Sequence, residues 1–403
     1  MPQKLDSLKY KQTINSKPAE IYRAFTTPTG LSEWLCNKAY IQPGNNSSFY
    51  LWWQNGYYVC GEYTQCEPDI EVGFTWFGKD EPGPSTVRVN IKEKDTGSQL
   101  TLTHLDLGTG KNWKKTRSQI DKGWQDALDN LSTVLEEGQD KRQSNRPMMG
   151  ITGVEPVSEE IMKKYNLPKP KGLLLSGVIN GMGAQNAGLQ AGDVLLKLDN
   201  KKLNQEQDLL QLIGKHKAGD TVKVIFFRQG EKRETELTFT EKLHYDIPQN
   251  PGELTSQVDA MYKQLTSQIE LMLKGVSEEK ASSAPDQGEW NIKQVLAHLI
   301  SSEKDTHSWI CSLLDDRDCL FEFHENRNCL LNSIIAVCPT INGLIKDLKR
   351  NTSETVAYLN NLDENFVDHK RSYNRLGEFL LSTTFHYQDH IDQIKKIIEN
   401  DLP

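Results

Sequence analysis

Two polar stretches without hydrophobic periodicity divide this chain and limit it to separate folded pieces. The first, EEGQDKRQSNRP, covers 136–147, and the second, KLHYDIPQNPGE, covers 242–253. Both carry proline, glycine, asparagine or charge, which is typical of linkers. A chain of 403 residues is also too long for one compact hydrophobic core. We therefore expect three domains, at 1–140, 146–241 and 250–401.

The composition argues against several classes of function. A net charge of −8 does not suit a nucleic-acid interface or an anionic membrane surface. The chain has no apolar run long enough to span a bilayer, and its start, MPQKLDSLKYKQTI, lacks the apolar segment of a signal peptide. Seven irregularly spaced cysteines indicate reduced thiols. We expect a cytoplasmic protein with no nucleic-acid or membrane partner.

The first piece combines short helices, a run of strands and one long closing helix. Pro18 favours a helix start near Ser16, and Thr27-Pro28 ends that helix. Turn-forming residues separate the expected strands, and a long amphipathic helix follows at 114–137. This order predicts an α+β fold. The expected strands are 48–53, 57–66, 73–77, 86–94 and 98–107.

The segments SKPAEIYRAFTTPTGLSEWL and GWQDALDNLSTVLEE resemble the SRPBCC (START-like) superfamily, nearest to activator-of-Hsp90-ATPase-like proteins. The resemblance implies a helix-grip domain in which a curved sheet encloses a pocket for a small apolar ligand. Six of the eight tryptophans lie in this piece, where they either fill the core or line such a pocket. His104 and Asp106 are candidate polar groups of the pocket, although residues at strand ends also often face water.

The second piece carries the run AGLQAGDVLLKLDN between short strands and an amphipathic helix at 204–216. It resembles a PDZ domain, a β-barrel-like fold, of the type attached to bacterial HtrA proteases. The resemblance places the carboxylate-binding loop at Met148, Met149, Gly150 and Ile151. Backbone N–H groups of such a loop can hold the C-terminal carboxylate of a peptide, which would add as a strand beside 151–154. Proteolysis is not expected, because no Ser-His-Asp constellation accompanies this piece.

The third piece predicts an all-α four-helix bundle. Amphipathic patterns cover 254–276, 290–299, 338–362 and a last segment that reads LGEFLLSTTFHYQDHIDQIKKII. Asn291 suits an N-cap, with Gln294 at the capping-box position. Together with the first two pieces, this gives a multidomain α+β chain.

Histidines replace apolar residues on the inner face of the last helix. His386 and His390 lie four residues apart, so their rings are neighbours on one helical face and can bind one metal ion. His298 lies in another strong helical segment and can complete a three-histidine site. The alternative is that these histidines are hydrogen-bonded core residues. We place Glu303 off the metal face, and treat Tyr387 and Asp389 as candidates for groups that support the ligands.

The segment WNIKQVLAHL, together with HYQDH near the C-terminus, resembles the DinB/YfiT-type metal-binding superfamily. The resemblance implies a divalent metal, zinc or nickel, held by His298, His386 and His390. Some members of that superfamily are thiol-dependent transferases. His307, His324 and His369 match no position of the family and are expected at the surface.

Two functions follow from this reading. The first is a cytosolic multidomain binding protein, whose PDZ domain binds a peptide C-terminus beside an apolar-ligand pocket and a metal site. The second is a metal-dependent thiol transferase with accessory domains. An enzyme needs an open metal position with a substrate pocket and an acid or base nearby. The sequence offers no such constellation beyond the histidines.

Overall fold

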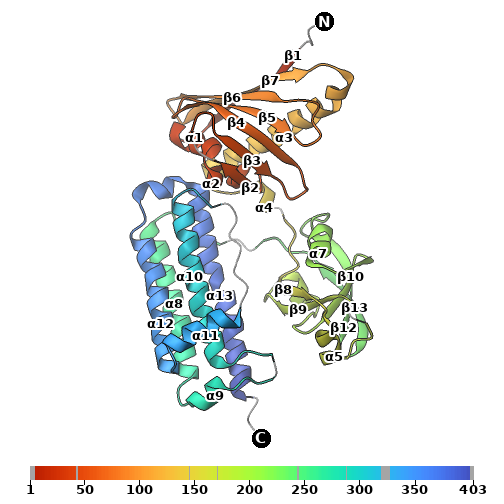
Figure 1. The fold of residues 1–403 in the computed structure, drawn as a ribbon, viewed down its shortest axis with the longest axis vertical. Coiled ribbons are helices and arrows are strands. Elements are labelled where there is room, and N and C mark those ends of the chain that lie inside the picture. Colours follow the sequence, from red (N-terminus) through yellow and green to blue (C-terminus); the bar gives the residue numbers. More distant parts are fainter. Residues whose placement is uncertain are drawn as a thin grey trace. The chain divides into compact units, whose positions relative to one another are not determined.

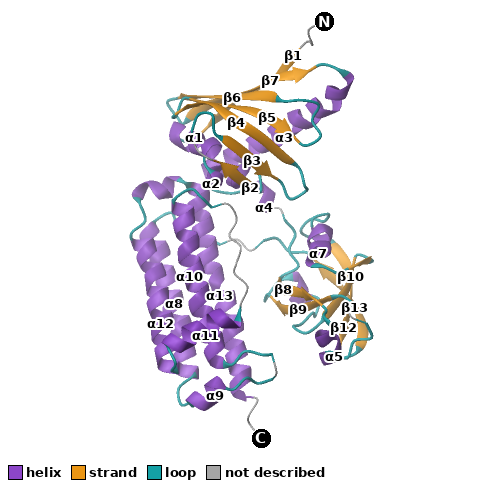
Figure 2. Ribbon diagram, in the orientation of Figure 1, coloured by secondary structure: helices purple, strands orange, loops and turns teal. Residues whose placement is uncertain are grey.

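A computed structural model of the chain describes residues 5–41, 44–144, 146–169, 171–242, 245–286, 288–318 and 327–399. The chain forms two compact units, one made of 1–140 with 245–403 and the other of 141–244. The first unit contains an antiparallel sheet domain and a helical bundle, and the second contains a smaller sheet domain (Figures 1 and 2). The mixed α+β fold class predicted from the sequence is confirmed.

The N-terminal domain is one antiparallel sheet that packs against a long helix. Its strands are hydrogen-bonded in the order β1-β7-β6-β5-β4-β3-β2. Two edge strands, β1 and β2, escaped the sequence analysis, because neither shows a clear apolar alternation. The elements are β1 (Leu5–Ile14), α1 (Pro18–Thr26), α2 (Pro28–Trp34), β2 (Lys38–Ile41), β3 (Ser48–Trp52), β4 (Tyr58–Glu67), β5 (Glu71–Gly78), β6 (Ser85–Glu93), β7 (Ser98–Gly108) and α3 (Lys111–Glu137).

The second unit is the small sheet domain, with strand order β13-β12-β10-β9-β8 and β11 beside β10. Its apolar core contains Met149, Leu195 and Phe239. The elements are α4 (Lys141–Ser144), β8 (Ile151–Pro156), α5 (Glu159–Lys164), β9 (Leu173–Val178), α6 (Gly183–Asn186), β10 (Val194–Leu198), β11 (Lys201–Lys202), α7 (Glu206–Ile213), β12 (Thr221–Arg228) and β13 (Glu231–Thr238).

The C-terminal domain is a bundle of four long helices that lie side by side (Figure 1). Helix α10 packs on α12 and α13, and α8 packs on the same two helices. The capping box predicted at Asn291 and Gln294 is confirmed. The elements are α8 (Pro251–Met272), α9 (Glu278–Ser282), α10 (Ile292–Leu314), α11 (Asn328–Val337), α12 (Ile341–Asn360), a 3₁₀ turn η1 (Glu364–Asp368) and α13 (Lys370–Glu399).

Among the described residues, no single helix is long and apolar enough to cross a membrane. Helices α11 and α12 would be long and apolar enough only if they were taken together, and they are bent by 103° where they meet. None of the six described cysteines forms a disulfide, and Cys319 lies outside the described residues.

A buried ionic network joins the N-terminal domain to the bundle within the first unit. Arg23 of α1 donates to Asp316, which follows α10, with Nε 2.9 Å from Oδ1. Arg23 also contacts Glu33 at 3.3 Å and donates to the Ser372 hydroxyl at 2.8 Å. The Arg23 side chain is only 9% exposed, so its charge is compensated by these partners rather than by water.

The same network reaches the helix that bears the histidine pair. Arg375, in the first turns of α13, pairs with Asp318 and Glu33. The end of α10 and the start of α13 are therefore tied to each other and to the N-terminal domain. These are the two helices that carry the predicted metal ligands.

We predict that Arg23→Met destabilises the first unit by about 3 kcal/mol, because the buried Glu33 carboxylate then loses its ion pair with Arg23. The measurement is the free energy of unfolding in a denaturant titration. Lys349→Met is the matched control, since its ion pair with Glu270 is exposed, and it should cost less than about 1 kcal/mol. Equal losses in the two variants would show that the buried network does not hold the domains together.

Candidate metal centre and adjoining cavity

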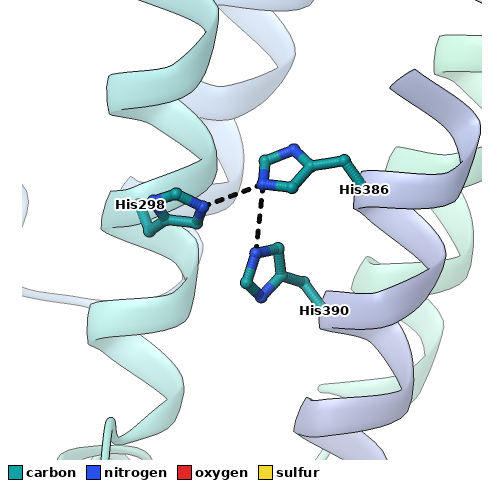
Figure 3. Close-up of side chains that lie close together, drawn as sticks. All are labelled: His298, His386 and His390. Atoms are coloured by element: carbon teal, nitrogen blue, oxygen red, sulfur yellow. Dashed lines mark hydrogen bonds between the residues drawn. The ribbon is translucent and has the colours of Figure 1, made fainter. Parts of the chain in front are cut away.

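The structure brings the three predicted histidines together between two antiparallel helices. His298 comes from α10, and His386 with His390 comes from α13; all three rings point into the space between the helices (Figure 3). The Nε2 atom of His386 lies 2.9 Å from Nε2 of His298 and 3.2 Å from Nε2 of His390. Candidate ligand atoms of all three lie within 4.8 Å of one another.

These distances suit a metal ion. Nitrogen ligands of a tetrahedral ion, at about 2.0–2.1 Å from it, lie about 3.3 Å apart. The Nδ1 atom of His390 lies 2.9 Å from Oε1 of Gln393. The amide oxygen accepts a hydrogen bond from Nδ1–H, so the ring has its lone pair on Nε2, which faces the other two histidines. The residues present therefore fit a three-histidine site for a divalent ion.

Burial favours the neutral form of two of the three histidines. It lowers the pKa of His386 to about 3, with further contributions from the neighbouring His390 and His298. Burial also lowers the pKa of His390. Neutral imidazoles offer lone pairs, which a cation needs and protonated rings lack.

Trp290 covers one side of the cluster. Its ring lies 5.1 Å from that of His298 and is stacked on that of His390 at 6.3 Å. Trp290 was not expected at the site. It directly precedes the N-cap Asn291, and this place at the start of α10 is the one feature of the sequence that could have put its ring near His298.

A cavity of about 400 Å³ opens beside the cluster. His298 and His386 form part of its wall. Hydroxyl, apolar and acidic groups line the remainder. These residues are Ser301, Ser302, Glu303, Asp305, Thr306, Leu330, Leu331, Phe379, Ser382, Thr383 and Tyr387.

Glu303 lies five residues after His298, about 140° around the helix, and is expected off the metal face. It is not part of the group of three histidines, but it lines the same cavity and is only 2% exposed. Tyr387, next to the candidate ligand His386, donates its hydroxyl to Glu303 Oε1 at 2.9 Å. Burial raises the pKa of the Glu303 carboxyl, and the hydroxyl donors oppose that shift.

The other candidates in the bundle divide between buried and exposed. The prediction of a surface position is wrong for His307, which is buried and bonds to Thr355 at 2.9 Å. His369 lies at the domain interface, where its Nδ1 is 2.8 Å from Glu20. Asp389 is exposed. His324 lies outside the described residues.

The predicted peptide-binding loop precedes the edge strand β8. Met149 is buried in the core, and its carbonyl accepts from the Ala184 N–H at 2.6 Å. Gly150 has φ +80°, and a Cβ there would lie 2.2 Å from Met182 Cβ, so this position requires glycine. Helix α7 contacts β8, as the wall of a groove would.

In the N-terminal domain, His104 is fully buried and Asp106 is exposed. The Trp124 indole donates to His104 Nδ1 at 3.0 Å, and His104 Nε2 lies 2.7 Å from the Ser85 hydroxyl. Both ring nitrogens of His104 thus have partners. Four of the six tryptophans are buried in the core. They are Trp34, Trp76, Trp113 and Trp124.

Comparison with family models supports the three resemblances, in the predicted order. Residues 15–136 match the family described as Activator of Hsp90 ATPase homolog 1-like protein. Residues 147–239 match the PDZ domain, and residues 261–394 match the DinB superfamily. The chain is therefore a multidomain protein that combines binding modules.

Similar proteins cover only parts of the chain. The periplasmic pH-dependent serine endoprotease DegQ of Escherichia coli is 37% identical over 93 residues, which are 23% of this chain and 20% of that protein. A probable periplasmic DegP-like endoprotease of Hahella chejuensis is 21% identical over 49% of this chain and 41% of its own length. The chain thus spans a fifth to two fifths of these relatives.

Solved structures match about a third of the chain. A protein from Mesorhizobium loti is 22% identical and covers 32% of this chain and 96% of its own, with a TM-score of 0.30. The Aha1 dimer from Colwellia psychrerythraea is 20% identical and covers 33% of this chain and 98% of its own, with a TM-score of 0.29.

We predict that His104 makes the stability of the first unit depend on pH. Burial lowers its pKa to about 4 in the folded state, against 6.5 for the free side chain. The unfolded chain therefore binds a proton first, and stability falls as the pH drops from about 6.5 to about 4, by up to about 3 kcal/mol. In His104→Gln, the free energy of unfolding should fall less between these two pH values, because the titrating imidazole is absent. Denaturant titrations across the pH range measure this free energy for both proteins, and an equal pH dependence in the two would contradict the prediction.

Proposed function

We propose that the helical bundle binds one divalent metal ion, zinc or nickel, through His298, His386 and His390, and acts on a small molecule held in the adjoining cavity. One observation carries the proposal: three ring nitrogens converge at the wall of a cavity of about 400 Å³. A purely structural zinc site is usually closed by four protein ligands, whereas a catalytic one keeps a position open. The three histidines leave such a position on the cavity side.

The reaction class that this arrangement favours is metal-dependent thiol transfer. A divalent ion at the site would lower the pKa of a thiol bound at its open position, so that the thiolate forms near neutral pH. The protein's own groups hold and orient the reactants. Ser302 and Thr383 offer hydroxyls to polar groups, while Phe379 and Leu331 exclude water from one side. Because thiol transfer needs reduced thiols, we propose the cytoplasm as its location.

An enzyme needs a pocket and an acid or base beside the metal position. The cavity supplies the pocket, and Glu303 supplies a buried carboxyl group on its wall. This supports the enzyme over a bundle that only stores a metal.

We predict that the purified protein holds close to one divalent ion per chain and that His298→Ala or His386→Ala removes it, because each variant leaves only two ligands. Metal content by mass spectrometry of the native protein measures this. His216→Ala, in the other unit, is the control and should keep the metal. The metal-loaded wild type should also consume a low-molecular-weight thiol with an electrophilic acceptor, and His386→Ala should not. A wild type that cannot be loaded with zinc or nickel would contradict the proposal.

A second proposal concerns the small sheet domain, which we infer to bind the C-terminus of a protein partner. Strand β8 is the edge of its sheet and is paired only with β9 in the described part of the domain. Its free edge can accept an added peptide strand. The loop Met148-Met149-Gly150-Ile151 lies at the start of that strand, where a terminal carboxylate would end.

We predict that a fluorescent peptide with an apolar C-terminal residue binds this domain, and that amidation of its carboxylate lowers the affinity at least tenfold. Gly150→Ala should have a similar effect, since the positive φ and the contact with Met182 forbid a side chain. Gly219→Ala is the matched control, because its φ of +90° imposes similar strain where a Cβ meets nothing within 4 Å. Fluorescence polarisation measures the affinities, and equal binding of acid and amide peptides would contradict the carboxylate site.

A further inference from the structure

A single carboxylate occupies the centre of the bundle, and all four long helices contribute to its surroundings. Glu303 of α10 accepts hydrogen bonds from Tyr387 of α13 at 2.9 Å, from Thr355 of α12 at 2.9 Å and from Tyr262 of α8 at 3.2 Å. Oε1 receives one of these bonds and Oε2 receives two. Hydroxyl donors at both oxygens are the arrangement that suits an ionised carboxylate.

Burial and the charge of Glu303 raise the pKa of Tyr262 well above the usual value, so this phenol keeps the proton that it donates. His307 lies 2.9 Å from the Thr355 hydroxyl, so this hydroxyl has a partner besides Glu303. The layer of polar groups is therefore built around the carboxylate.

No cation balances this carboxylate among the residues that the structure describes. Its neighbours are neutral hydroxyls, and Glu303 is only 2% exposed to water. A buried charge without an opposite charge is costly, even with hydrogen bonds. Two other buried carboxylates of this unit, those of Glu33 and Asp318, each pair with an arginine. A cation bound on the wall of the same cavity would lower this cost.

The cavity wall connects Glu303 to the three-histidine cluster. His298, His386, Tyr387 and Glu303 line the same cavity. Three neutral histidines would leave a divalent ion with its full double charge in a partly buried site. An anionic group on the same wall lowers the free energy of that ion, and the ion in turn stabilises the buried carboxylate.

We propose that Glu303 is the built-in counter-charge of the metal centre, held in place by one hydroxyl from each of the other three helices. This inference rests on the proposed metal function and assigns to the site a residue outside the three ligands. In this role Glu303 acts on the metal through its charge and is not a ligand. The polar layer thereby serves metal binding as well as the packing of the helices.

The test compares Glu303→Gln with Asp305→Asn in the full chain, using zinc alone as the probe. Both changes remove one negative charge from the same cavity wall and the same helix, but Asp305 is less buried and its charge is better screened. The zinc dissociation constant, from competition with a chromophoric chelator, should rise at least tenfold in Glu303→Gln and less than about threefold in Asp305→Asn. Thermal unfolding with and without zinc gives a second readout, because the zinc-induced stabilisation should shrink only in Glu303→Gln.

The outcomes separate this inference from the proposed function. Unchanged zinc affinity in a folded Glu303→Gln protein, or equal losses in both variants, would overturn the counter-charge while leaving the three-histidine site intact. A wild type that binds no zinc would overturn both. If Glu303→Gln does not fold, Glu303→Asp decides: it keeps the charge but weakens the hydroxyl bonds, so it should lose stability yet stay within about threefold of wild-type zinc affinity. A tenfold loss in Glu303→Asp would overturn the proposal.

Discussion

The antiparallel pairing of α10 with α13 is the interaction on which the candidate site depends. It places His298 opposite His386 and His390, and it also brings Glu303 against Tyr387. The ion pair between Asp318 and Arg375 ties the same two helices at one end. A shift of one helix along the other by a single turn would be about 5.4 Å, which would separate all of these contacts at once. The register of this helix pair therefore fixes the candidate metal ligands, the buried carboxylate and the cavity together.

The part of the site that lies on one helix could be predicted from the sequence. His386 and His390 repeat at the helical spacing on an apolar stripe, and the capping box at Asn291 marks where the helix of His298 begins. The helical period also predicted the long helices, and turn residues predicted most strands. The edge strand β1, whose apolar residues do not alternate clearly, gave no comparable signal.

Contacts between helices could not be predicted in the same way. The helical period separates Glu303 from the face of His298, but it predicts neither the cavity that both residues line nor the hydrogen bond from Tyr387 of α13. The burial of His307 likewise depends on Thr355 of α12, far along the chain. The network around Arg23 joins residues about 300 positions apart. Such side chains look like ordinary surface charges in a sequence, and only tertiary packing shows that they are buried.

The binding of one metal ion by the three histidines can be tested by a crystal structure of the zinc-loaded protein with anomalous diffraction data at the zinc edge. We expect one strong anomalous peak about 2.0–2.1 Å from Nε2 of His298, His386 and His390, with a non-protein ligand on the cavity side. A protein saturated with zinc that shows no peak at these histidines, or a peak closed by a fourth protein ligand, would contradict it.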